Sequence, residues 1–230
     1  MCFSAGVSFG AAAVLGGAGV ISLKKVSQRG QVMFASLPLL FGIQQACEGV
    51  LWLSLTHSCL VKMQTPFTFI FLFFAQVLWT TFIPLSFLLM EKNPLRKKLL
   101  YASLAAGICD SLLLGYRLVF YEVRAEIDCR HIYYNIGTTQ FIVVTSSILY
   151  VIAIILPPFI SSVKETKILG TLLTLSLLAS KLIYESYLIS VWCFFAAVIS
   201  IMVVHMMKQF QKEKVPDGLI KSSNRFSQQH

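Results

Sequence analysis

The chain has 230 residues, of which 57% are hydrophobic and only 13% are charged, and its formal net charge is +9. That balance excludes an ordinary soluble domain, in which about a quarter of the residues are charged. The basic residues are spread over several separate segments, so we expect no nucleic-acid partner. The composition instead indicates a chain that lies mostly within a lipid bilayer.

Apolar runs of membrane-spanning length follow one another along the chain. They predict an all-α, polytopic bundle of seven transmembrane helices. The first run lacks a basic leader and a small-residue cleavage site, so we interpret it as a permanent span and not as a signal peptide. Its Gly6-x-x-x-Gly10 spacing, repeated by Ala12 and Gly16, predicts close approach of a neighbouring helix. The predicted spans are residues 4–23, 32–55, 66–90, 97–120, 133–158, 167–183 and 187–207.

The basic residues predict the orientation. If the spans alternate, one side of the membrane receives most of the Lys and Arg residues, and the positive-inside rule assigns that side to the cytoplasm. We therefore expect the N-terminus outside and the C-terminus inside, in a multi-pass protein of the cell membrane (the inner membrane in a bacterium). Residues 1–207 form the predicted transmembrane domain and residues 208–230 a flexible basic cytoplasmic tail. The cytoplasmic group is Lys24, Lys25, Arg29, Lys92, Arg96, Lys97, Lys98, Lys164, Lys167, Lys208, Lys212, Lys214, Lys221 and Arg225.

The second span carries unusual polar side chains. In the stretch LLFGIQQACEGVLWLSL, Gln44, Gln45, Glu48 and Trp52 occupy about one quarter of the helix surface, because each residue advances about 100°. Exposing an ionisable group to lipid costs at least roughly 2.5–3.5 kcal/mol. We therefore expect this polar stripe to face other helices.

The fourth span repeats the pattern with Ser103, Asp110 and Arg117, which lie seven residues apart and nearly on one line. Under the predicted topology these groups, with His131 and Trp192, lie in the middle or outer half of the membrane. If the second and fourth spans face one another, the side chains form a polar pocket that opens to the outer side. The predicted pocket residues are Gln44, Gln45, Glu48, Trp52, Asp110, Arg117, His131 and Trp192.

Each feature also has a structural interpretation, and both readings stay open at this point. Buried amides join helices through hydrogen bonds worth roughly 1 kcal/mol each, and carboxylates pair with Arg117 or Lys181. Lys181 and Glu185 are spaced to form an ion pair if the sixth helix continues that far. Cys59 and Cys129 follow the second and fourth spans, and we hypothesise a disulfide between them if the outer side is oxidising.

Four stretches of the chain, in this order, resemble a family of small seven-span membrane proteins, mostly bacterial: MCFSAGVSF, PLLFGIQQACEGVLW, RHIYY and SVWCFFAAVIS. The resemblance extends to about Lys208 and implies the same fold. It implies no activity, because that family has no assigned biochemical function. The residues it emphasises are Cys2, Ser4, Gln44, Gln45, Glu48, Gly49, Trp52, His131, Trp192 and Cys193.

Two classes of function fit these residues. The first is a membrane-embedded protein that binds or transports a small polar ligand or ion at its carboxylates; a transporter of this size without an internal repeat would need to form a homo-oligomer. The alternative is a membrane hydrolase or lipid-modifying enzyme at the outer leaflet, with Glu48, Asp110 and His131 as acid–base groups. No HxxxH or HExxH spacing occurs, so we expect neither a metal nor a cofactor. The lipid bilayer is the expected partner in either case.

Overall fold

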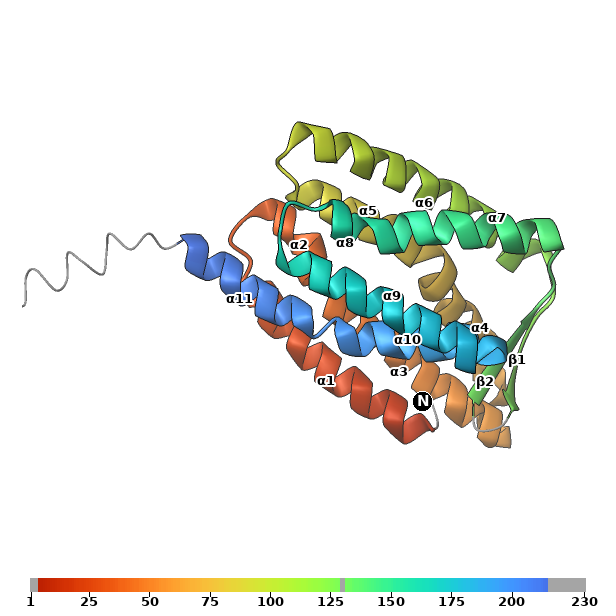
Figure 1. The fold of residues 1–230 in the computed structure, drawn as a ribbon. Coiled ribbons are helices and arrows are strands. Elements are labelled where there is room, and N and C mark those ends of the chain that lie inside the picture. The colour runs from red at the N-terminus through yellow and green to blue at the C-terminus, as the bar shows by residue number, and fades with distance from the viewer. Residues whose placement is uncertain (1–3, 129–130, 215–230) are drawn as a thin grey trace, which may run out of the picture.

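The computed structural model describes residues 4–128 and 131–214 of the chain. Within these residues, seven helices are long and apolar enough to cross a membrane, which confirms the predicted fold class. They run side by side as one bundle (Figure 1). The spans are Ala5–Lys24, Arg29–Thr56, Ser58–Met90, Pro94–Phe120, Gln140–Ile160, Glu165–Ile183 and Leu188–Gln211.

Several spans consist of more than one helical segment. The first, fourth and sixth are the single helices α1 (Ala5–Lys24), α6 (Pro94–Phe120) and α9 (Glu165–Ile183). The second contains η1 (Arg29–Gln31), α2 (Val32–Ala35) and α3 (Leu37–Thr56), and the third contains η2 (Ser58–Leu60), α4 (Val61–Leu72), η3 (Phe73–Leu78) and α5 (Trp79–Met90). The fifth contains α7 (Gln140–Tyr150), η4 (Val151–Ile155) and α8 (Leu156–Ile160). After η5 (Glu185–Tyr187), the seventh contains α10 (Leu188–Ile199) and α11 (Met202–Lys214).

The predicted start of the fifth span, residue 133, is wrong. Tyr133 and Tyr134 belong to β2 (His131–Ile136), which pairs with β1 (Val123–Asp128) in an antiparallel hairpin. This stretch is rich in aromatic and β-branched residues, which favour a strand, and the span itself begins only at Gln140. Thr139 caps the helix, because its hydroxyl accepts a hydrogen bond from the Ile142 N–H at 3.5 Å.

The bundle has two chemically different ends. The hairpin end carries β1–β2, η2 and η5 together with the start of α1, and the basic end carries the connections at residues 25–28, 91–93 and 161–164 and the end of α11 (Figure 1). The helix α11 runs to Lys214, so the first residues assigned to the tail, from Lys208, are helical. Residues 215–230, like Cys2 and Cys129, lie outside the described residues, and the Cys59–Cys129 disulfide stays a prediction.

A carboxylate fastens two connections at the basic end. Glu91 accepts hydrogen bonds from the backbone N–H groups of Lys92 and Asn93 in its own connection, both at 2.9 Å. It also accepts hydrogen bonds from the backbone N–H of Ser162 at 2.7 Å and from the Ser162 hydroxyl at 2.9 Å. Burial opposes ionisation of this group, but these hydrogen bonds outweigh it and hold the pKa of Glu91 below its usual value.

Glycines set the closest helix contacts. Gly42 of α3 lies against the backbone of Gly16 in α1, as the small-residue spacing predicts. A Cβ atom at Gly107 of α6 would collide with the Thr80 carbonyl of α5. These contacts fix α3 against α1 and α6 against α5.

The second and fourth spans do not face each other, so the assumption behind the single predicted pocket is wrong. Helix α3 packs on α1, α4 and α10, whereas α6 packs on α5, α7 and the segments η3 and η4. The neighbours of α3 explain this arrangement. The third span packs against α3 through α4, and α10 also packs against it, so α6 is not among its main neighbours.

Two π-helical segments interrupt the third and fifth spans. η3 lies in the third span and η4 in the fifth, just before the Pro157–Pro158 pair, which cannot donate hydrogen bonds to the preceding turn. Side-chain hydroxyls from neighbouring helices donate hydrogen bonds to backbone carbonyl oxygens in both segments. The hydroxyl of Tyr150 donates to the Ala75 carbonyl at 3.2 Å, that of Ser111 to the Val77 carbonyl at 2.7 Å and that of Ser103 to the Ile152 carbonyl at 2.7 Å. Such segments are frequent at functional sites.

Candidate functional site

The polar stripe of α3 is buried, as its helical spacing predicts. Gln44, Gln45 and Glu48 have no exposed surface, whereas Ile43 on the opposite face is 45% exposed. The Trp79 indole N–H of α5 donates to Gln44 Oε1 at 2.8 Å, and the Ser190 hydroxyl of α10 donates to Glu48 Oε1 at 2.7 Å. The stripe therefore joins α3 to α5 and α10.

The remaining stripe residues are also enclosed. Neither amide atom of Gln45 has a hydrogen-bond partner among the described residues. Trp52 belongs to an apolar cluster with Phe71 and Tyr134, beneath the hairpin. The Cys193 thiol lies beside Gln44 and Glu48, which adds a second contact between α10 and α3.

Asp110 lies apart from this stripe, on α6, which packs on the opposite side of the third span. Its carboxylate is fully buried and faces Ser146 of α7 and Arg117 of its own helix. Neither oxygen of the carboxylate has a well-formed hydrogen bond among the described residues, and the part of the chain that the structure describes has no ion pair between Asp110 and Arg117. The structure thus separates the two carboxylates that were expected to share one pocket.

A cavity of about 390 Å³ lies between η3, α6, α7, α9 and α10, and we call it the lateral cavity. Its volume falls within the range of roughly 300–1,000 Å³ that is usual for ligand sites. Arg117 and Trp192, both predicted, line it, but Glu48 and Asp110 do not. The polar lining includes Gln76, Arg117, Ser146, Ser147, Tyr150 and Lys181.

The lining of the lateral cavity is largely apolar, and its charged groups are both positive. Arg117 and Lys181 are the two charged residues that line it. Among the described residues neither makes an ion pair, and Arg117 Nε is buried without a hydrogen-bond partner. Ser146 and Ser147 add hydroxyl groups. A guanidinium, an ammonium and hydroxyls suit an acceptor-rich, negatively charged group.

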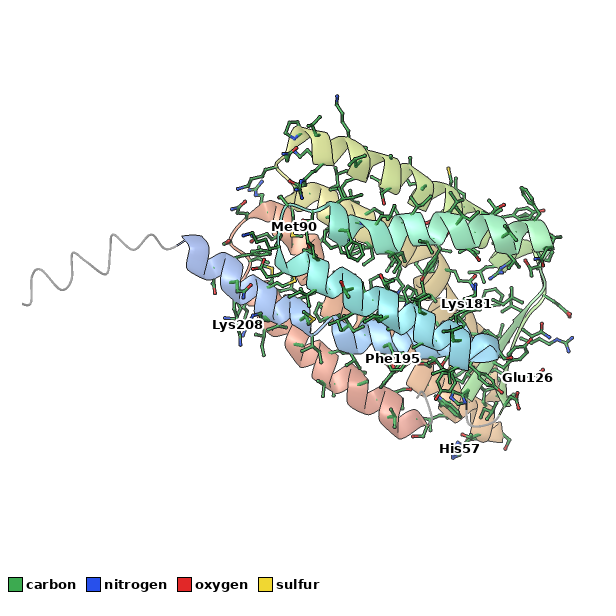
Figure 2. All side chains as sticks on the ribbon, viewed as in Figure 1. His57, Met90, Glu126, Lys181, Phe195 and Lys208 are labelled. Atoms are coloured by element: carbon green, nitrogen blue, oxygen red, sulfur yellow. The ribbon has the colours of Figure 1, made fainter. Side chains whose placement is uncertain are left out.

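The lateral cavity opens between α7 and α9. At the basic end α9 packs on α8 and η4, but toward the hairpin end α7 and α9 diverge (Figure 1). Figure 2 shows Lys181 in the space between them. Val143 and Ser147 of α7 line the cavity and are also exposed on the outside of the bundle, so they form one edge of its mouth.

Tyr150 and Trp192 form the inner wall. Their rings pack edge to face with centroids 5.3 Å apart. Both residues, with Cys193, also line a second cavity of about 40 Å³ whose remaining lining is almost entirely apolar. Helix α10 therefore separates two polar regions: Ser190 and Cys193 contact the stripe, and Trp192 contacts the lateral cavity.

His131 belongs to neither region. It is buried on β2, where its ring stacks on Tyr187 at 4.6 Å and lies 5.4 Å from the ring of Tyr184. The Tyr187 hydroxyl donates to Asp128 Oδ2 at 2.6 Å, which ties η5 to β1. Within the described residues, no group of three or more His, Cys, Asp or Glu side chains is placed to hold a metal ion.

Sequence reasoning missed several lining residues. Lys181 was interpreted as the partner of Glu185, but α9 ends at Ile183, before Glu185. Ser146 and Tyr150 share one face of α7 through their i, i+4 spacing, a signal that the misplaced start of the span obscured. Gln76 lies in η3, and only the fold brings it to the cavity.

Seven membrane-crossing helices around buried polar groups define a multi-pass α-helical membrane protein. A model of a family of unknown function (DUF6629) matches residues 1–217, and the chain belongs to this family. The resemblance to an uncharacterised family is thereby confirmed. No curated protein and no solved structure matches the chain.

Proposed function

We propose that this membrane protein binds a small anionic ligand in the lateral cavity. The observation that carries the proposal is the pairing of Arg117 and Lys181 on one cavity, with no ion pair to either residue among those described. Arg117 is partly buried without a direct ion pair, and an anionic ligand would offset the cost of burying its charge.

This proposal changes the charge of the expected ligand. The sequence led us to expect a polar ligand, a cation or a proton at Glu48 and Asp110. Glu48 instead bonds to Ser190 inside a closed helix contact, and Asp110 contributes a negative charge behind Arg117. We infer that Asp110 positions the guanidinium electrostatically and that Glu48 joins helices.

The hydrolase alternative lacks a comparable observation. It needs His131 beside Glu48 or Asp110, but His131 packs on Tyr184 and Tyr187 at the hairpin, while Asp110 lies within α6. Binding is therefore the function that the geometry supports best. As part of the proposal we place the protein in the cell membrane (the inner membrane in a bacterium), with the basic end in the cytoplasm by the positive-inside rule.

The test measures thermal unfolding of the detergent-purified protein with increasing sodium phosphate, against sodium chloride at matched ionic strength. Ligand binding to the folded state raises the midpoint in a saturable manner. We expect such a rise for the wild type and its loss in Arg117→Gln/Lys181→Gln. The matched control is Arg124→Gln/Lys62→Gln, which removes one Arg and one Lys from exposed positions at the hairpin end.

An equal response in all three proteins would contradict the proposal. Phosphate also strengthens apolar burial generally by its exclusion from protein surfaces, and that effect does not depend on Arg117 or Lys181. The test therefore rests on the difference between the two double variants in how far phosphate raises the unfolding midpoint.

A further inference from the structure

Building on the proposed anion site, we infer that its occupant is an anionic phospholipid that enters sideways between α7 and α9 from the leaflet at the hairpin end. The lipid phosphate lies between Arg117 and Lys181, and the acyl chains stay in the bilayer along the mouth. Three features of the lateral cavity carry this inference: its depth, the direction of its opening and its size.

The two cations lie at headgroup depth. Arg117 is less than one helical turn from the end of α6 at Phe120, and Lys181 is two residues from the end of α9 at Ile183. The opposite edge, Val143 to Ser147, belongs to the first two turns of α7. Helices α6 and α9 end, and α7 begins, at the hairpin end of the bundle. The charged part of the cavity therefore lies near the polar surface of one leaflet and not at mid-membrane.

The mouth faces the side of the bundle. Val143 of α7 is 39% exposed and Val151 of η4 is 41% exposed although both line the cavity, so this edge faces both the outside of the bundle and the cavity. Leu177 precedes Lys181 by one turn on the α9 edge. Apolar edges leading to two cations match a phospholipid, whose anionic head is joined to apolar chains.

The space behind the inner wall of the lateral cavity has no room for an acyl chain. The lateral cavity ends on Tyr150, Trp192 and Cys193, and the apolar space behind them measures only about 40 Å³. That volume holds a few water-sized groups. The chains of a bound lipid therefore lie in the seam between α7 and α9, and the site recognises the headgroup.

The test reconstitutes the full chain in nanodiscs of phosphatidylcholine with phosphatidylglycerol and counts retained lipids by native mass spectrometry after release into detergent. The wild type should retain phosphatidylglycerol in preference to phosphatidylcholine. Arg117→Gln/Lys181→Gln should lower that preference at least about tenfold, since each cation near a membrane surface attracts anionic lipid. The control Arg124→Gln/Lys62→Gln should keep it.

A second variant blocks the mouth without changing charge. Val143→Phe places a ring at the exposed, apolar edge of α7, and we expect it to remove lipid retention while inorganic phosphate still raises the unfolding midpoint. This variant separates entry of a lipid from attraction of an anion. Size-exclusion chromatography of each variant confirms that it is folded.

The outcomes separate the two proposals. Equal phosphatidylglycerol retention in the wild type and in Arg117→Gln/Lys181→Gln overturns the lipid inference. If inorganic phosphate still stabilises the wild type selectively in that case, the anion site stands and its ligand is soluble. If neither lipid nor phosphate distinguishes the two proteins, both proposals fail.

Discussion

The polar stripe of α3 and the lateral cavity both hold polar groups within the helix bundle, but they differ in what surrounds those groups. Gln44 and Glu48 are enclosed, and each accepts a hydrogen bond from another helix. Arg117 and Lys181 instead line open space, and neither has an ion-pair partner among the described residues. The first region resembles the interior of any polar helix contact, and the second resembles a binding site without its ligand.

The difference teaches that polarity within a span does not itself identify a site. The stripe is the more conspicuous feature of the sequence, with two amides and a carboxylate in five residues. Its partners Trp79 and Ser190 lie far along the chain, and they account for its polarity without a ligand. The cavity residues come from separate spans, and only their unpaired donors mark them.

The largest loss of stability should come from truncating a buried side chain of the polar stripe. Glu48→Ala removes a fully buried side chain and the acceptor of the Ser190 hydroxyl, so we expect it to lower the free energy of unfolding by about 3 kcal/mol. Thermal unfolding in detergent measures the change. Glu126→Ala, on the exposed face of β1, is the control and should change stability by less than about 0.5 kcal/mol. Equal effects of the two substitutions would mean that the stripe does not hold the helices together.

Two tryptophans permit a matched comparison of the regions. Trp79→Phe removes the donor to Gln44 Oε1 and leaves a buried acceptor unpaired, whereas the Trp192 indole N–H has no partner among the described residues. Both substitutions remove the same atoms. We therefore expect Trp79→Phe to be more destabilising by about 1–2 kcal/mol, measured by thermal unfolding of both variants. A larger loss of stability in Trp192→Phe than in Trp79→Phe would contradict our description of the polar stripe as closed and the lateral cavity as open.

Lys181→Gln should leave stability unchanged within about 0.5 kcal/mol in phosphate-free buffer, because it removes an exposed charge that has no ion pair in the described chain. The same variant should show a weaker rise of the unfolding midpoint with phosphate. Ser190→Ala is the complementary change, and we expect it to lower stability while the phosphate response persists. The two variants together test whether stability and binding are separated in this way.

The smallest effect concerns a paired carboxylate outside the membrane. Because hydrogen bonds hold the pKa of Glu91 below its usual value, its contribution to stability is fully present above the unfolded-state pKa. It is lost as the pH falls through the lower, folded-state pKa. We therefore expect stability to decline in this acidic window in the wild type and to decline less in Glu91→Gln. Thermal unfolding between neutral and acidic pH measures this, and parallel curves for the two proteins would refute it.

Much of the fold could be predicted because membrane helices follow simple local rules. The seven spans follow from apolar run lengths, and burial of Gln44, Gln45 and Glu48 follows from about 100° per residue. The hairpin was missed because RHIYY adjoins an apolar run, and its pairing with residues 123–128 is not local. A span boundary placed at residue 133 then hid the positions of Ser146 and Tyr150 relative to their helix start.

The site was harder to predict, because it depends on which helices are neighbours. Arg117 and Trp192 were identified from depth and aromaticity, and both line the lateral cavity. Lys181 was not, since a lysine near a helix end has an ordinary surface explanation. The separation of Glu48 from Asp110 by the third span also depends on which helices pack together, and local sequence patterns do not specify that order.

The most direct test of the central claim is a crystal structure of the protein grown from a phosphatidylglycerol-containing lipid phase. The proposals predict density for a phosphate between the Arg117 guanidinium and the Lys181 ammonium, with chains leaving between α7 and α9. A lateral cavity that holds only water, with lipid phosphates elsewhere on the bundle, would contradict them.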